Sequence, residues 1–283
     1  VTGVQTCALP ILLTHSINPR GGVVHCLELA EALIERGHRV SVHAPAAPGA
    51  GLFRSTRATV ELIPDRGVPG DDLRRRVLSR IAAFRQWFAA PARRQFDVFH
   101  AHDGIGANAL LALRDDGLVP AYVRTVHHLE ESFGDPLLDQ MEARSIRAAN
   151  LLLAVSPSWA DRLAERFGRS AVMVGNGVDV RRFRPAADGV DAALRARLGL
   201  GPGPLFVAVG GVEARKNTLG ILKGFIRLRA ALPTAQLVIA GGASLLDHGP
   251  YRRRVEDEAA AAGLPVQRPG AAAGVAPAVV LTG

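Results

Sequence analysis

Polar side chains that could do chemistry follow two apolar, strand-like runs of this sequence. His102 and Asp103 come directly after one run, and His127 and His128 come directly after another. In an open α/β sheet, ligands bind at the carboxyl ends of the strands, so these residues are candidates for acid–base work or for contact with a polar substrate. For a single histidine, a hydrogen-bonded structural role remains the alternative. No third ligand lies nearby at a spacing typical of zinc sites, so we expect no metal.

Two further stretches could bind phosphate. Gly21 and Gly22 precede a helix, where glycine lets the backbone approach an anion and the free N–H groups favour negative charge. An ordinary tight strand–helix turn is the alternative there. Glu213, Arg215 and Lys216 follow an apolar run, and cations at a strand end suit a diphosphate, with exposed loop cations as an equal alternative. The sequence contains neither a Gly-x-Gly-x-x-Gly fingerprint nor a Gly-Lys-Ser/Thr phosphate loop.

Strand-like and helix-like runs alternate along the chain, which is typical of parallel α/β sheets. A first set predicts strands at 11–14, 39–43, 60–63, 98–101, 121–126, 151–155 and 172–174, and helices at 23–36, 71–88, 104–113, 136–149 and 157–167, the last capped by Ser156. A second set predicts strands at 205–209, 236–240 and 278–281, and helices at 218–231 and 251–262. The sequence therefore predicts an α/β protein with two doubly wound, Rossmann-like domains.

The composition shifts indicate where these domains begin and end. We expect a first, acceptor-side domain at 11–184, a connector at 185–204 and a second, donor-binding domain at 205–283. Residues 1–10 have no start methionine and resemble translated adapter sequence, so we expect them to be non-native. The second domain passes into low complexity and ends on a strand, and we expect it to be incomplete.

Composition excludes several classes of protein. Of the 283 residues, 48% are hydrophobic and 21% are charged, so the chain can bury a core and is not disordered. No apolar run reaches the roughly 18 residues that a membrane-spanning helix needs. Two cysteines cannot build a disulfide framework, and we expect a cytoplasmic location.

The net charge of +8 does not by itself indicate a nucleic-acid or membrane partner. The basic runs Arg74–Arg76 and Arg252–Arg254 lie in predicted helices without interleaved aromatic residues. We expect solvated helix faces. Peripheral contact with the anionic inner face of a membrane is the main alternative, and no nucleic acid is expected.

The order of these motifs resembles the retaining GT-B glycosyltransferases of family 4, also called group 1. The resemblance covers about residues 11–265, and the matching stretches are Pro19–Gly22, Asp97–Asp103, Arg124–His127, Ala154–Ser156, Asn176–Asp179 with Phe183, and Gly210–Lys216. It implies transfer of a sugar from a nucleotide sugar to an unknown sugar, lipid or small-molecule acceptor, with retention of anomeric configuration.

The resemblance also implies a role for each matching residue. Lys216 would neutralise the diphosphate leaving group, and His127 would lie beside the transferred sugar. No metal or other cofactor is implied, because these cations do what Mg²⁺ does in other enzymes. The remaining donor-binding residues would be Gly21, Gly22, Asn176, Glu213 and Arg215, and the acceptor-binding residues would be Asn18, Arg20, His102, Asp103 and His128.

The chain departs from the family pattern at two points. Gly211 stands where the family usually has arginine, so one arm of the diphosphate clamp is missing or is supplied by Arg215. No copy of the family's Glu-x7-Glu element follows Lys216, so we expect little or no activity from this chain. Two alternatives remain open: another GT-B enzyme such as a nucleotide-sugar epimerase, and a non-catalytic module that binds anionic lipid or nucleic acid.

Overall fold

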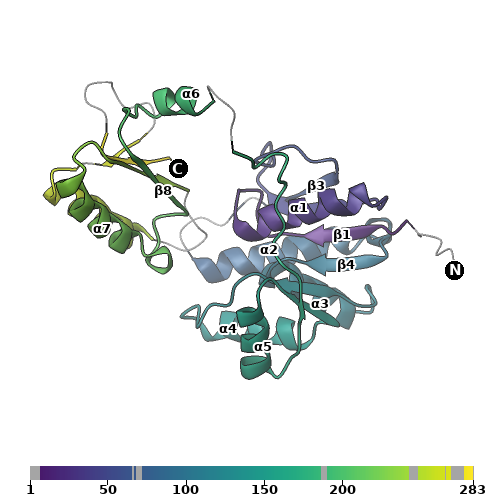
Figure 1. The fold of residues 1–283 in the computed structure, drawn as a ribbon. Coiled ribbons are helices and arrows are strands. Elements are labelled where there is room, and N and C mark those ends of the chain that lie inside the picture. The colour runs from purple at the N-terminus through teal and green to yellow at the C-terminus, as the bar shows by residue number, and fades with distance from the viewer. Residues whose placement is uncertain are drawn as a thin grey trace. The chain divides into compact units, whose positions relative to one another are not determined.

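The computed structural model describes residues 7–65, 67, 72–185, 190–241, 248–264, 266–268 and 277–282. Residues 1–6 of the predicted non-native segment, and Asp71 at the predicted start of a helix, lie outside these ranges. The chain divides into two compact units, Val1–Phe183 (unit 1) and Arg184–Gly283 (unit 2). Each unit has its own parallel sheet with helices packed on it (Figure 1). The structure thus has the α/β class that the sequence predicts.

The sheet of unit 1 has seven strands in the order β3-β2-β1-β4-β5-β6-β7. The described strand pairs are all parallel. Strand order reverses between β1 and β4, and this is the place where open α/β sheets bind ligands. The strands are β1 (Pro10–Leu13), β2 (Ser41–Ala46), β3 (Thr59–Pro64), β4 (Val98–Ala101), β5 (Val123–Val126), β6 (Leu151–Ala154) and β7 (Val172–Met173).

Helices cover both faces of this sheet. Ile11 and Leu13 of β1 belong to one core cluster, which includes residues of α2 and α3, whereas Leu12 belongs to a second cluster with residues of α1. This alternation is the one expected of a strand that is buried on both faces. The helices are α1 (Gly21–Glu35), α2 (Leu73–Phe88), η1 (Pro91–Arg94), α3 (Gly104–Asp115), α4 (Pro136–Arg147) and α5 (Pro157–Phe167).

Local sequence signals explain several element ends. Ser156 accepts a hydrogen bond from the backbone N–H of Trp159, which confirms it as the N-cap of α5. Gly168 adopts a left-handed conformation (φ 65°) just after that helix, where glycine has no Cβ penalty. At the other end of the unit, β1 begins at Pro10, within the segment that we expected to be non-native, and the N–H of Leu9 donates to Oδ2 of Asp97 at 2.7 Å.

A buried ion pair anchors the strand that precedes His127. Arg124 of β5 has a side chain only 2% exposed, and its Nη2 lies 2.5 Å from Oε1 of Glu142 on α4. The guanidinium also donates to the hydroxyl of Ser145. Gly104, the first residue of α3, lies so close that a Cβ there would be 2.4 Å from Oε2 of Glu142. Strand β5, α4 and the start of α3 therefore meet at one charged contact inside the unit.

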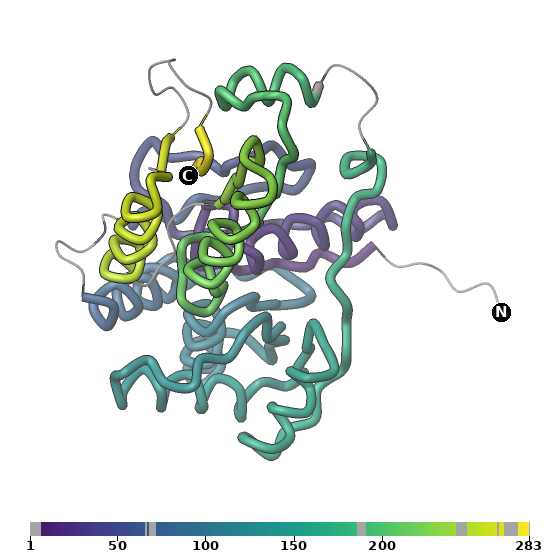
Figure 2. The backbone as a smooth tube through the Cα atoms, turned by 60° about the vertical axis from the view of Figure 1, so that its left-hand side comes forward, coloured from purple at the N-terminus to yellow at the C-terminus, as the bar shows by residue number. Residues whose placement is uncertain are grey.

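Unit 2 has a four-stranded parallel sheet in the order β10-β11-β9-β8. Helices α7 and α8 lie side by side (Figure 2) and pack on the sheet through residues such as Phe225 and Val255. α6 falls within the predicted connector and was not indicated by the sequence pattern. The elements are α6 (Val190–Arg197), β8 (Leu205–Val209), η2 (Ala214–Lys216), α7 (Thr218–Ala231), β9 (Gln236–Ala240), α8 (Gly249–Ala261), β10 (Val266–Gln267) and β11 (Val279–Leu281).

Strand β8 at the end of this sheet is unusually open for an apolar parallel strand. Val207 is 58% exposed and Val209 is 83% exposed. Because these two side chains are two residues apart, they share one face of the strand. Among the described residues of both units, no helix is long and apolar enough to cross a membrane.

His43 is a buried histidine in β2. Its ring stacks on Phe88, with centroids 5.5 Å apart, and its Nε2 lies 2.8 Å from the hydroxyl of Ser41. Burial, and to a smaller degree the positive charge of Arg93, lowers the pKa of His43 to about 3. The folded protein therefore holds this imidazole neutral at any pH near neutrality.

We predict that His43 makes the protein sensitive to acid. In the unfolded chain a histidine has a pKa near 6.5 and takes up a proton as the pH falls below that value, whereas the folded protein does not protonate His43 until about pH 3. Its contribution to stability is therefore intact above pH 6.5 and falls by about 2 kcal/mol between pH 7 and pH 5. Urea unfolding of the protein and of His43→Gln at both pH values measures this. The loss should be smaller in the variant by about that amount, and equal losses would contradict the prediction.

Candidate functional site

The carboxyl-terminal edge of the first sheet brings two predicted site residues together. β4 and β5 are neighbouring strands, so the segments that follow them meet. Nδ1 of His102 lies 3.3 Å from Nε2 of His127, and the two rings are stacked with centroids 5.6 Å apart. His102 is buried, and His127 is partly exposed.

A third histidine, His25 of α1, joins this pair. Its ring centroid lies 4.7 Å from that of His127 and 5.6 Å from that of His102. Its Nδ1 lies 3.1 Å from Oδ1 of Asn176, which comes from the segment after β7. Sequence reasoning did not find His25. The available signal was its spacing, because a residue three positions after Gly22 lies on the same face of the helix.

The three imidazoles are neutral at physiological pH. Burial, followed by the unfavourable interaction of two protonated rings with His25 so close, lowers the pKa of His127 to about 4 against the opposing charge of Asp103. Burial also lowers the pKa of His102 well below its usual range, and it lowers the pKa of His25 against the opposing effect of the hydrogen bond with Asn176. Each neutral ring has one N–H donor and one acceptor nitrogen, and part of this capacity is used within the cluster.

Gly22 permits the close approach of α1 to His127. A Cβ at position 22 would lie 3.2 Å from Cδ2 of His127 and 3.7 Å from the carbonyl oxygen of His102. A Cβ at Gly21 would meet nothing within 4 Å. The N-cap residue, Arg20, makes no side-chain hydrogen bond to the first turn, and that turn has no acidic residue. The start of α1 therefore combines a suitable dipole with a backbone that a ligand can approach.

Asp103 anchors the segment that follows β1 through hydrogen bonds with His15. Its Oδ2 accepts hydrogen bonds from the backbone N–H of His15 at 2.7 Å and lies 3.3 Å from the Nδ1 of the same residue, while its Oδ1 caps α3 through the N–H of Gly106. Burial alone would raise the pKa of Asp103, but these hydrogen bonds outweigh it and lower the pKa. The carboxylate is thus ionised and orients His15, which the sequence analysis did not single out. An acceptor-binding role for Asp103 stays a prediction.

The remaining predicted acceptor residues lie around this cluster. Nε2 of His128 lies 3.0 Å from Oε1 of Glu130, and its ring packs edge-on against Trp159 of α5. His128 therefore contacts a different helix from His127, although the two are adjacent in sequence. Asn18 donates its backbone N–H to the hydroxyl of Ser16 at 3.1 Å. The roles of Asn18, Arg20 and His128 stay predictions.

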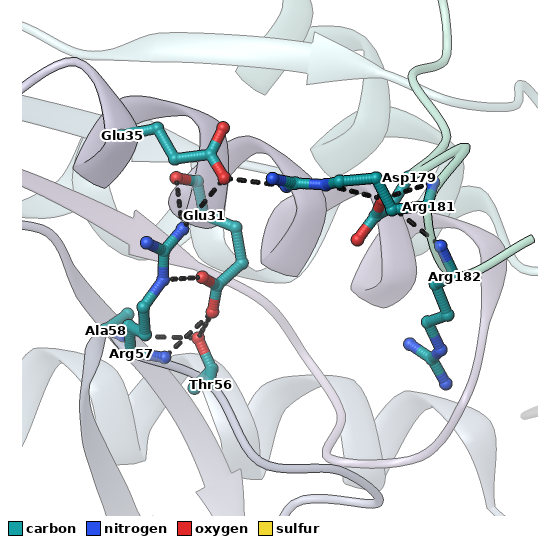
Figure 3. Close-up of polar contacts among 8 residues, drawn as sticks. All are labelled: Glu31, Glu35, Thr56, Arg57, Ala58, Asp179, Arg181 and Arg182. Atoms are coloured by element: carbon teal, nitrogen blue, oxygen red, sulfur yellow. Dashed lines mark hydrogen bonds and ion pairs between the residues drawn. The ribbon is translucent and has the colours of Figure 1, made fainter.

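A groove of about 960 Å³ runs beside α1 in unit 1. Ion pairs line its rim: Nε of Arg57 lies 2.5 Å from Oε2 of Glu31, and Nη2 of Arg181 lies 2.9 Å from Oε1 of Glu35 (Figure 3). His25 also lines this groove, so one side chain belongs to both the groove and the histidine cluster. The groove was not predicted, because its walls come from distant parts of the sequence.

In unit 2, two glycines and a lysine meet at the ends of β8 and β9. A Cβ on Gly241 would lie 2.5 Å from the carbonyl carbon of Gly210, so both backbones depend on the absence of a side chain. The aliphatic stem of Lys216 crosses the same glycine, 3.3 Å from where a Cβ of Gly210 would be. In the described part of the chain, the Lys216 ammonium has no hydrogen bond or ion pair. It is exposed and available to an anion.

The predicted neighbours of Lys216 are engaged with each other. Nη2 of Arg215 lies 3.0 Å from Oε2 of Glu213, whose residue is only 8% exposed. The positive charge of Arg215 is thus partly neutralised in this structure, and Lys216 is the better candidate for binding a phosphate. The donor-binding roles of Glu213 and Arg215 remain predictions.

Solved structures of similar shape define the class of fold. Sucrose-phosphate synthase from Thermosynechococcus elongatus superposes with a TM-score of 0.72 at 18% identity, over 98% of this chain and 70% of that one. The likeness establishes the GT-B fold predicted from the sequence, with the second domain the smaller. Residues 19–182 match the family described as Glycosyltransferase Family 4. The chain belongs to that family, which confirms the resemblance seen in its motifs.

Curated relatives agree with this assignment. A phosphatidyl-myo-inositol mannosyltransferase from Mycolicibacterium smegmatis is 29% identical over 80% of this chain. A GDP-mannose-dependent alpha-(1-6)-phosphatidylinositol monomannoside mannosyltransferase from the same organism is 27% identical over 85% of it. The chain spans 57% of the length of the first relative and 61% of the second.

We predict that Gly22→Ala destabilises the protein, whereas Gly21→Ala does not. Both changes add a methyl group to the first turn of α1 and gain similar helix propensity, but only position 22 lacks room for it. The crowding against His127 should lower the free energy of unfolding by about 1 kcal/mol relative to Gly21→Ala. Denaturant unfolding of both variants measures the difference, and equal stabilities would show that α1 does not hold the imidazole this closely.

Proposed function

We propose that this chain forms part of a retaining glycosyltransferase that moves a hexose from a nucleotide sugar to an acceptor hydroxyl. Lys216 in unit 2 binds the donor diphosphate, and His127 in unit 1 contacts the transferred sugar. The observation that carries the proposal is the ammonium of Lys216, which has no hydrogen bond or ion pair among the described residues and belongs to a side chain that packs on Gly210 at the end of β8, in a chain of glycosyltransferase family 4.

In this proposal, stabilisation of the negative charge on the leaving group accounts for most of the rate acceleration. The bond between the anomeric carbon and the diphosphate oxygen breaks while the acceptor oxygen bonds to the same carbon, and the hydroxyl proton passes to the leaving diphosphate. Negative charge grows on the diphosphate during this step, so a fixed cation stabilises the transition state more than the ground state. The lack of a competing carboxylate among the described residues supports Lys216 in that role.

His127 suits contact with a neutral sugar. A neutral imidazole donates one hydrogen bond and accepts another, so it can orient a hydroxyl without adding charge beside the reacting carbon. The pKa of about 4 keeps the ring in that form across the physiological range. The adjacent first turn of α1 has backbone N–H groups that suit the negative charge of the donor.

The relatives' names support mannose as the hexose and an inositol phospholipid as the acceptor. Peripheral contact with a membrane on the cytoplasmic side follows from that proposal. The arginines of α2 give little further support for a membrane contact, because Arg74 is paired with Asp135 and Arg85 is paired with Asp116. GDP-mannose is therefore the first donor to test, with UDP-glucose as the comparison.

We predict that Lys216→Ala weakens binding of GDP by about 1.5 to 3 kcal/mol, the range for hydrogen bonds to charged groups. Lys223→Ala is the matched control, because Lys223 is the other lysine of the chain and lies on α7 near Glu258, 3.6 Å away. Isothermal titration calorimetry of both variants measures the change. Unchanged affinity in Lys216→Ala would remove Lys216 from the donor site.

We further predict that His127→Gln weakens binding of the sugar part of the donor and leaves binding of the nucleotide part unchanged. If the imidazole contacts only the sugar, the variant should bind GDP as the original protein does and bind GDP-mannose about fivefold more weakly, the effect of one neutral hydrogen bond. Titration of both ligands into both proteins checks this. Equal losses for GDP and GDP-mannose would place His127 elsewhere.

A further inference from the structure

The three histidines of unit 1 have the arrangement of a metal-ligand set. One ring nitrogen from each of His25, His102 and His127 lies within 4.8 Å of the other two. Tetrahedral zinc sites place ligand nitrogens about 3.3 Å apart, and the contact between His102 and His127 already has that spacing. His25 needs a shift of about 1.5 Å at most, which ring rotation on the first turns of a helix can supply.

The surroundings prepare these rings for a cation. Oδ1 of Asn176 can accept only from an N–H, so the Nδ1 of His25 carries the proton and its Nε2 is left with a free lone pair. A second hydrogen bond of this kind is what orients histidine ligands in metal proteins. In His102 the nitrogen that faces His127 is Nδ1, so Nδ1 is the atom that this ring offers to a metal.

The chemistry of the donors selects the kind of metal. Three neutral imidazoles suit Zn²⁺, Co²⁺, Ni²⁺ and Cu²⁺, whereas Mg²⁺ and Ca²⁺ require oxygen ligands. The nearest carboxylate in sequence, Asp103, is occupied by His15 and Gly106.

We propose that His25, His102 and His127 bind one divalent transition metal, Zn²⁺ in the first place, with three imidazole nitrogens and a water molecule as ligands. The metal occupies the nitrogen that His127 offers to the sugar, so it acts as an inhibitor of donor binding. The metal site stands on the geometry alone, and only its inhibitory effect rests on the proposed function.

The test uses the full chain without a polyhistidine tag, freed of metal by dialysis against a chelator. Co²⁺ is titrated first, since tetrahedral Co²⁺ with nitrogen ligands gives strong visible absorption, and Zn²⁺ is then used to displace it. We expect one metal per chain. In His25→Gln the affinity should fall at least tenfold, and in Asn176→Ala, which removes only the orienting hydrogen bond, it should fall between tenfold and 100-fold. Circular dichroism checks that each variant is folded.

His38→Gln is the matched control, since His38 is partly exposed at the end of α1 and accepts from the N–H of Ala8 outside the cluster. Its metal affinity should not change. Substoichiometric binding, an unchanged affinity in His25→Gln, an equal loss in His38→Gln, or displacement of Co²⁺ by excess Mg²⁺ would each overturn the site.

A separate titration tests inhibition. Zn²⁺ should weaken binding of GDP-mannose to the original protein and have no effect on its binding to His25→Gln. If Zn²⁺ binds at one equivalent but leaves donor affinity unchanged, the metal site stands and the placement of His127 beside the sugar fails. The two proposals can therefore fail independently.

Discussion

The absence of a side chain at Gly22 is the constraint on which the histidine cluster at the carboxyl-terminal edge of the first sheet depends. A Cβ at position 22 would lie 3.2 Å from Cδ2 of His127, so a larger residue would move α1 or the imidazole by a few tenths of an ångström. That approach carries His25 onto the same two rings and buries them, and burial is the largest cause of their lowered pKa values. The same approach sets the open first turn of α1 beside the imidazoles. The missing methyl group thus affects how closely α1 packs on the imidazoles and, through their burial, how easily the rings take up a proton.

The histidine cluster also requires that strand β5 keep its position, and Arg124 anchors this strand. The residue lies three positions before His127, and its guanidinium is held between Glu142 and Ser145 with almost no exposure. A buried charge that loses its partner costs about 3 to 5 kcal/mol, so β5 cannot slide along its neighbours without a large loss of stability. The position of His127 is therefore fixed by the ion pair of Arg124 with Glu142 and by the packing of α1 against its ring.

Much of the fold could be predicted because its signals are local. Apolar runs, glycine stops and the Ser156 cap all lie within a few residues of the elements that they define, and the order of the motifs identified the family. The site was less predictable, because the contacts of His25 with Asn176 and of Glu213 with Arg215 appear only when the chain is folded. Adjacent histidines show the same limit: His127 and His128 contact different helices, and no spacing rule indicated which one joins the cluster. α6 was missed because the prolines around it indicated a connector.

Strand β8 has a consequence for how this protein behaves in solution. Among the described residues it is the last strand of its sheet, so one row of its backbone groups has no neighbouring strand there, and Val207 and Val209 expose an apolar face beside that row. An open edge next to exposed valines is a template for pairing between molecules. The net charge of +8 keeps molecules apart at low ionic strength, but added salt screens that repulsion and leaves the edge unopposed. An exposed strand edge on a basic chain thus favours association between molecules more at high ionic strength than at low.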